Sequence, residues 1–210
     1  MTVELVVVGA SLGGFDALRV LLGGLPAELP VPVVVIQHQG DTSGDLGRLL
    51  QRYSSLPVCE AEDKEGIGSG HAYLAPAGYH LLVERGSFAL STEAPVQYAR
   101  PSIDVTFESA AEAYGAGVVG VVLTGAGRDG ADGLARIKRR GGRAIVQDPD
   151  TAFRRDMPAA ALASVAVDWV APLEEIAPRI VALCMPSGQA PSEHPPSGRR
   201  SATTHSMPRS

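Results

Sequence analysis

A serine near the amino terminus lies in a setting that could make it a nucleophile. Ser11 belongs to the segment Gly-Ala-Ser-Leu-Gly-Gly over residues 9–14, and its flanking glycines match the Gly-x-Ser-x-Gly pattern of a nucleophile elbow. The backbone N–H groups of Leu12 and Gly13 would lie at the positive end of a helix dipole, where they could hold an oxyanion. The same segment also fits a glycine-rich nucleotide-binding turn or a serine N-cap.

A histidine and an aspartate further along the chain could complete a catalytic triad with this serine. His38 carries an imidazole, which exchanges protons near neutral pH and therefore suits a general base. Asp129 lies in the glycine-rich segment 124–130, and its carboxylate could accept the other imidazole N–H and orient the ring. The alternatives are a structural histidine and an aspartate that caps the helix beginning near Gly130.

Each of these three residues follows a stretch that is typical of a buried strand. The apolar runs 3–8, 31–36 and 117–123 predict strands covered on both faces of a parallel sheet. Helices are expected over 15–22 and 131–140, each of which ends at a pair of glycines. Because the carboxyl ends of parallel strands meet at one edge of a sheet, we expect the three residues to lie at the same rim.

The rest of the chain continues this alternation, with an interruption in the middle. There, three short strand-like pieces separated by turn residues predict a hairpin. A longer helix should follow, with Pro101 in its first turn and Ser102 or Asp104 near its cap. The pattern predicts an α/β fold, a doubly wound, mostly parallel, Rossmann-like sheet sandwich with a small antiparallel hairpin. The expected pieces are Gly70–Leu74, Tyr79–Glu84 and Ser87–Leu90, a helix over 101–114, strands over 143–146 and 165–170, and helices over 158–162 and 172–183.

Length and composition predict one domain over residues 1–185, followed by a tail. Residues 186–210 are rich in serine, proline, glycine and arginine, and we expect them to be disordered. The formal net charge of −5, with basic residues spread along the chain, argues against nucleic-acid binding. Neither a signal peptide nor a long apolar run is present, so a cytoplasmic protein without membrane insertion is expected, most simply a monomer. Cys59 and Cys184 lie far apart, with no spacing typical of a metal site.

Five segments, taken together and in order, resemble the catalytic domain of the CheB family of chemotaxis protein-glutamate methylesterases. The likeness runs from about residue 3 to residue 183. It implies hydrolysis of glutamate γ-methyl esters on methyl-accepting chemoreceptors, with release of methanol, and glutamine deamidation as a related activity. It also implies Ser11 as nucleophile, His38 as general base and Asp129 as its partner, with no metal or organic cofactor. The segments are Gly9-Ala10-Ser11-x-Gly13-Gly14, Gln37-His38, Gly70-His71-Ala72-Tyr73-Leu74-Ala75-Pro76, Arg100-Pro101-Ser102-Ile103-Asp104-Val105 and Leu123-Thr124-Gly125-x-Gly127-x-Asp129-Gly130.

The chain departs from the family pattern around the expected site. Leu12 stands where the family usually has threonine, and Ala126 stands where it has methionine. Backbone donors at both positions could still bind an oxyanion, because they do not depend on the side chain. The segment 39–43 replaces a Met-Pro segment, and we expect a protein without the receiver domain that regulates typical family members. Arg100 could bind an acidic receptor surface, although it could equally be solvated.

Two other functions remain open from the sequence. The chain could be a serine esterase or amidase that acts on a different ester. It could also be a non-catalytic relic that binds a receptor or a nucleotide, although the segment 9–14 lacks both a full Gly-x-Gly-x-x-Gly fingerprint and the Gly-Lys-Ser/Thr of a P-loop.

Overall fold

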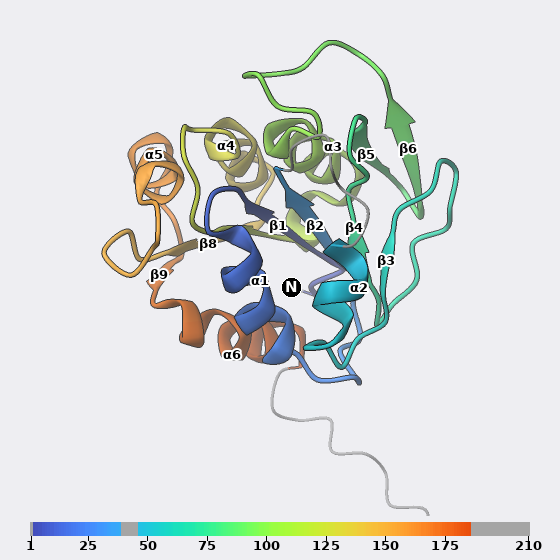
Figure 1. Ribbon diagram of the computed structural model, residues 1–210, viewed down its shortest axis with the longest axis horizontal. Helices are drawn as coiled ribbons and strands as arrows, with labels where there is room; N and C mark the ends of the chain where they lie inside the picture. The colour runs from blue at the N-terminus through green and yellow to red at the C-terminus, as the bar shows by residue number, and fades with distance from the viewer. Residues whose placement is uncertain (1, 39–45, 186–210) are drawn as a thin grey trace, which may run out of the picture.

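The computed structural model describes residues 2–38 and 46–185, which form a parallel sheet covered by helices (Figure 1). The segment 39–43 and the tail 186–210 lie outside the described residues. The seven strands of the sheet are all parallel and have the order β3-β4-β2-β1-β7-β8-β9. Their bounds are β1 Leu5–Ala10, β2 Val33–Gln37, β3 Val58–Glu60, β4 Ala72–Leu74, β7 Val118–Val122, β8 Arg143–Gln147 and β9 Trp169–Ala171.

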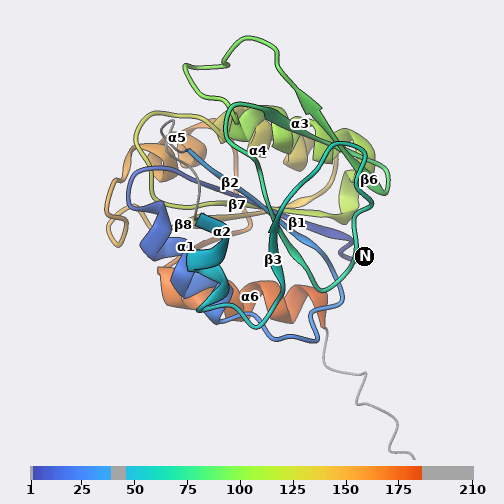
Figure 2. The same ribbon diagram turned by 45° about the vertical axis from the view of Figure 1, so that its right-hand side comes forward.

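Helices cover both faces of this sheet, as the turned view in Figure 2 shows. One layer holds α1, α2 and α6, and the other holds α3, α4 and α5 with the separate antiparallel hairpin of β5 and β6. A short 3₁₀ turn, Gly115–Gly117, leads from α3 into β7. The helices are α1 Gly14–Gly23, α2 Leu46–Gln51, α3 Ile103–Tyr114, α4 Ala131–Arg139, α5 Asp156–Ser164 and α6 Leu173–Cys184, and the hairpin strands are β5 His80–Glu84 and β6 Ser87–Ser91.

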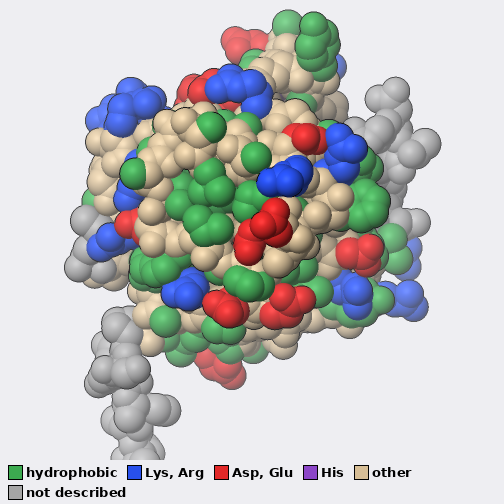
Figure 3. Space-filling view, turned by 90° about the vertical axis from the view of Figure 1, so that its left-hand side faces the viewer, with side chains coloured by type: hydrophobic (Ala, Val, Ile, Leu, Met, Phe, Trp, Pro, Cys, Tyr) green, Lys and Arg blue, Asp and Glu red, His purple; other side chains and the backbone are tan. Residues whose placement is uncertain are grey.

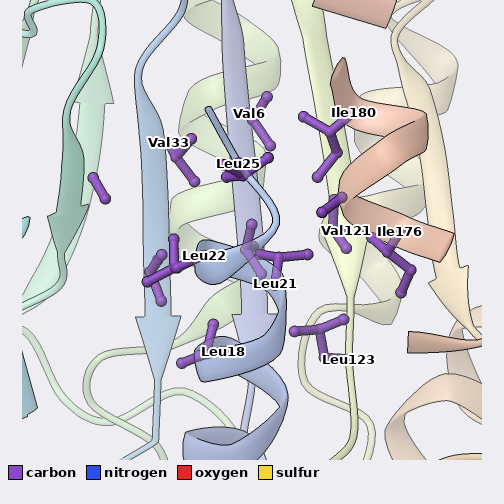
Figure 4. Close-up of a cluster of buried hydrophobic side chains, with 14 of the residues drawn as sticks. Val6, Leu18, Leu21, Leu22, Leu25, Val33, Val121, Leu123, Ile176 and Ile180 are labelled. Atoms are coloured by element: carbon purple, nitrogen blue, oxygen red, sulfur yellow. The ribbon is translucent and has the colours of Figure 1, made fainter. Parts of the chain in front are cut away.

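The burial of the central strand β1 explains why its sequence has no polar side chain. All six of its residues are buried, because alternate side chains point to opposite faces of the sheet and both faces are covered. Val6 and Val8 pack into the core under α1 and α6, whereas Leu5 and Val7 pack into the core under α3 and α4. Figure 4 shows the first core, where helical and strand side chains meet.

The order of the strands creates a topological switch beside β1. From β1 the chain moves to β2 and on to β3 and β4 on one side, then returns to β7 on the other side of β1 and continues outward to β8 and β9. In open α/β sheets, ligands bind outside the carboxyl ends of the strands at such a point. Two loops meet there, one after β1 that begins at Ser11 and one after β7 that leads to Asp129.

The predicted α/β fold with a mostly parallel sheet and a hairpin is confirmed, and several bounds are corrected. The first of the three middle pieces, β4, joins the parallel sheet, so only β5 and β6 form the hairpin. Helix α5 begins at Asp156, before Pro158, which is tolerated in a first turn because no helical acceptor is needed for its missing N–H. The last strand begins only at Trp169. Pro101 precedes the N-cap of α3, which is Ser102.

Candidate active site

Ser11 is held in a tight turn between β1 and α1. Its amide donates to the carbonyl of Thr124 at 3.0 Å, and its carbonyl accepts from the amide of Gly14 at 2.8 Å. Gly13 has a φ of 80°, a left-handed conformation that other residues rarely adopt. A Cβ atom at Gly14 would come within 1.9 Å of the Gln37 side-chain oxygen. The two glycines therefore permit a turn that directs Ser11 to the rim of the sheet.

His38 links the serine to the aspartate. It directly follows β2, and its amide continues the pairing with β1 by donating to the carbonyl of Ala10 at 3.1 Å. Its ring Nδ1 lies 3.2 Å from Ser11 Oγ, and its Nε2 lies 2.7 Å from Asp129 Oδ2. A neutral imidazole with its proton on Nε2 can donate to the carboxylate and leave Nδ1 free to accept from the serine hydroxyl.

Asp129 is buried, with 4% of its side chain exposed, and its carboxylate accepts four hydrogen bonds. Besides His38, the donors are the hydroxyl of Ser102 and the amides of Ile103 and Asp104, at 3.0, 2.8 and 2.9 Å. Burial by itself raises the pKa of Asp129, but the bonds from the imidazole and the α3 amides outweigh it and hold this pKa below its usual value. The carboxylate therefore stays ionised beside the imidazole.

The structure corrects the alternative in which Asp129 caps the helix that follows it. The N-cap of α4 is Gly130, which has no side chain that could cap this helix. The Asp129 carboxylate instead binds the amino terminus of α3, a helix from an earlier part of the chain. The predicted cap of α3 is confirmed, because the Ser102 hydroxyl also accepts from the amide of Val105.

The backbone groups expected to bind an oxyanion border the Ser11–His38 pair. Within residues 2–38 and 46–185, the N–H groups of Leu12, Gly13 and Ala126 donate to no protein acceptor. The loop of Ala126 approaches the serine closely, since a Cβ atom at Gly125 would lie 2.8 Å from Ser11 Cβ. These donors are therefore available to a ligand.

Two open cavities flank His38. One, of about 320 Å³, is lined by the segment 11–16 with Gln37 and His38. The other, of about 500 Å³, is lined by His38, residues 97–99 and residues 126–129. Leu12, which lines the first cavity, is 51% exposed, and Tyr98, which lines the second, is fully exposed. Phe153, which lies beside Gly13, is 74% exposed. On the side of the molecule where α5 lies, hydrophobic side chains gather near the centre, with acidic and basic side chains around them (Figure 3).

Arg100 is the one expected site residue that the structure does not place with the others. It lines neither cavity. Its guanidinium donates to the carbonyls of Thr92 and Glu93, both at 3.0 Å. Arg100 therefore fixes the loop that precedes α3, and a direct role in binding an acidic surface stays a prediction.

Polar side chains that sequence reasoning did not single out support the site. Gln37 donates to the carbonyls of Ser11 and His38, both at 2.9 Å. Thr124 donates to the carbonyl of Leu12 at 3.0 Å and accepts from the amide of Arg154 at 2.8 Å. Both are buried at or just after the end of an apolar strand, and a polar residue at such a place is the signal that could have indicated them.

Among residues 2–38 and 46–185, no group of three or more histidine, cysteine, aspartate or glutamate side chains could hold a metal ion. Within the same ranges, no helix has the length and apolar character needed to cross a membrane.

Asp104 should make stability depend on pH. Burial is the main reason that the pKa of Asp104 is raised to about 7. The negative charges of Asp129 and Asp132 also raise this pKa, whereas hydrogen bonds from the amides of Gly133 and Gly130 lower it. Because the folded state then holds a proton that the unfolded state releases, this stabilisation is complete below about pH 4 and is lost as the pH rises to about 7. Relative to Asp104→Asn, the wild type should lose up to about 1.4 kcal/mol of unfolding free energy per pH unit across that interval. Urea unfolding of both proteins from pH 4 to 8 measures this, and parallel curves would contradict it.

Comparison with known proteins agrees with the fold and the resemblance. Residues 6–180 match the family described as CheB methylesterase. A protein of Leptospira interrogans, named for protein-glutamate methylesterase and protein-glutamine glutaminase activity, is 45% identical over 185 residues, which cover 87% of this chain and 96% of that protein. A relative from Anaeromyxobacter dehalogenans, named for the same two activities, is 46% identical over 176 residues. The match covers 83% of this chain but only 51% of that relative, so the chain spans about half of its length.

A solved structure shows the same architecture. The CheB methylesterase catalytic domain of Thermotoga maritima superposes with a TM-score of 0.83 and 34% sequence identity, covering 87% of this chain and all of that domain. The sequence match and the shared fold extend over nearly all the described residues. This chain therefore belongs to the CheB methylesterase family.

Proposed function

We propose that this chain is a serine hydrolase that removes methyl groups from glutamate γ-methyl esters of methyl-accepting chemoreceptors, with glutamine deamidation as a second reaction. The observation that carries the proposal is the hydrogen-bonded chain from Ser11 through His38 to Asp129 in a member of this family. We assign the catalytic domain to residues 1–185 and expect it to act in the cytoplasm as a monomer that does not bind nucleic acid.

The first half of the proposed reaction forms an acyl-enzyme. Ser11 Oγ attacks the ester carbonyl while His38 Nδ1, 3.2 Å away, accepts the hydroxyl proton. The carbonyl oxygen gains negative charge, which the N–H groups of Leu12, Gly13 and Ala126, unpaired among the described residues, would stabilise. When the tetrahedral intermediate collapses, the C–O bond to the methoxy group breaks and the imidazolium donates its proton to release methanol.

The second half returns the enzyme to its starting state. Water attacks the γ-glutamyl ester of Ser11, and His38 accepts its proton and then donates one to Ser11 Oγ as that ester bond breaks. The product is a glutamate side chain. Asp129 stabilises the imidazolium in both halves and holds the ring in the required orientation.

Release of methanol from a methylated receptor tests the substrate. The purified chain is incubated with receptor cytoplasmic fragments that carry radiolabelled methyl esters, and volatile methanol is counted. We expect release that depends on the presence of Ser11. Hydrolysis of simple esters such as p-nitrophenyl acetate, without any release from the receptor, would instead identify an esterase for another substrate. Exposed Leu12, which replaces the family's usual threonine, is the feature that favours this second function.

A further inference from the structure

The amino terminus of α3 binds an aspartate that precedes α4, and the amino terminus of α4 binds an aspartate that lies in α3. Asp129, just before α4, accepts three hydrogen bonds from the start of α3. In return, Asp104 in the first turn of α3 accepts from the amides of Gly130 and Gly133 at 2.9 and 2.7 Å. Amides at the start of a helix lack intrahelical acceptors, and carboxyl oxygens can satisfy them. The two aspartate side chains therefore join the helices reciprocally.

The starts of α3 and α4 lie so close together that Gly130 and Gly133 have no room for a side chain. A Cβ atom at Gly133 would lie 2.5 Å from Phe107 Cβ and 3.0 Å from the carbonyl oxygen of Asp104. At Gly130, whose φ is 96°, a Cβ atom would lie 2.8 Å from Ile103. The distance between the helix ends is thus set by backbone contact together with the two carboxylates.

We infer that Asp104 is a positioning residue for this hydrolytic site: by holding the amides of Gly130 and Gly133, it fixes where Asp129 meets His38. The inference rests on the proposed function. Gly130 follows Asp129 directly in the chain, so a shift of the α4 amino terminus must move the Asp129 carboxylate. Displacements of about 1 Å in a catalytic array can lower rates by about 10²-fold.

Asp104 acts through Asp129 and not on the substrate itself. Its side chain is buried, with 4% of the residue exposed, and it lines neither cavity beside His38. Its second oxygen accepts from the side-chain Nε2 of Gln97 at 2.8 Å. Gln97 and Tyr98 have φ values of 48° and 66° and form a tight turn that lines the larger cavity. Asp104 thus also anchors the loop that borders the site.

Removing the Asp104 carboxylate should lower turnover without weakening substrate binding. In Asp104→Ala the two α4 amides lose their acceptor, and we expect kcat to fall on the order of 10- to 100-fold with little change in KM. Nitrogen-15 NMR of the imidazole should show that the Nε2–H tautomer of His38, which dominates in the wild type, becomes a mixture. If this variant does not fold, Asp104→Ser serves instead, because its shorter hydroxyl cannot hold both amides.

Two further variants separate positioning from general stability. Asp104→Asn keeps an acceptor oxygen for the α4 amides and should retain most of the wild-type kcat and the wild-type tautomer. Asp168 is a matched control, because it also ties α4 to a neighbouring segment, accepting from Lys138 at 2.7 Å and from the amide of Ala144 at 2.8 Å. Asp168→Ala should lower the free energy of unfolding and leave kcat and the imidazole tautomer unchanged.

The outcomes distinguish this inference from the proposed function. A wild-type tautomer and wild-type kcat in Asp104→Ala or Asp104→Ser would overturn the positioning role while the methylesterase proposal stood. An equal loss of kcat in Asp168→Ala would also overturn it, because the effect would then follow stability alone. If the wild type released no methanol from receptors but the tautomer still depended on Asp104, the proposed substrate would be wrong and the positioning role would stand.

Discussion

Replacing Ser11 by alanine should lower methyl ester turnover on the order of 10⁴-fold or more, because the acyl-enzyme can no longer form. The variant should fold normally. Among the described residues, the serine hydroxyl makes one hydrogen bond, to His38, and the backbone contacts of the turn do not involve the side chain. Methanol release and urea unfolding, measured on the same preparation, check both expectations.

Covalent labelling provides an independent test of the same residue. A fluorophosphonate should add to the wild type once per chain, and mass spectrometry of the peptides should locate the adduct at Ser11. Ser164→Ala is a matched control, since that serine is exposed and, in the part of the chain that the structure describes, its hydroxyl donates to the carbonyl of Ala160 within its own helix. The control should keep full labelling and turnover. Full activity in Ser11→Ala, or an adduct on another residue, would contradict the assignment.

The positions of Ser11, His38 and Asp129 could be predicted because each residue follows a run of apolar residues that is typical of a buried strand. Runs of apolar residues identified the strands, and the carboxyl ends of neighbouring parallel strands meet at one rim. Ser11, His38 and Asp129 follow three adjacent strands, β1, β2 and β7. That adjacency is enough to bring the side chains together even though 91 residues separate the histidine from the aspartate.

The partners of Asp129 could not be predicted in the same way. Its bonds to Ser102 and to the α3 amides join two helix termini from different parts of the chain, and no local pattern indicates which terminus a carboxylate will bind. The sequence suggested a cap for the helix next to Asp129, because capping usually acts on the adjoining helix. Tertiary packing of α3 against α4 decided otherwise.

Short elements were missed for a different reason. Helix α2 has six residues and strand β3 has three, which is too short for a periodic pattern to stand out. They are stable because they pack on the sheet: Leu50 of α2 is fully buried, and β3 pairs with β4. Helices of this length are unstable in isolation and depend on such packing.

Replacing Asp129 by asparagine should lower turnover strongly, although less than the loss of the serine. Each carboxylate oxygen accepts two donors: Oδ2 from His38 and Ile103, and Oδ1 from Ser102 and Asp104. An asparagine has one acceptor oxygen, so its NH₂ group must face donors on one side. In one placement it opposes the amide of Ile103 and the imidazole N–H, which forces the histidine into the wrong tautomer.

In the other placement the histidine keeps its acceptor, but the asparagine NH₂ faces the hydroxyl of Ser102 and the amide of Asp104. The hydroxyl can rotate to accept, whereas the amide is left without a partner, which costs about 1–3 kcal/mol in a buried position. In both placements the negative charge that stabilises the imidazolium is lost. We therefore expect kcat to fall on the order of 10³- to 10⁴-fold, together with a loss of unfolding free energy. Nitrogen-15 NMR of the imidazole identifies the placement, and a variant with wild-type kcat would show that the carboxylate is not needed for turnover.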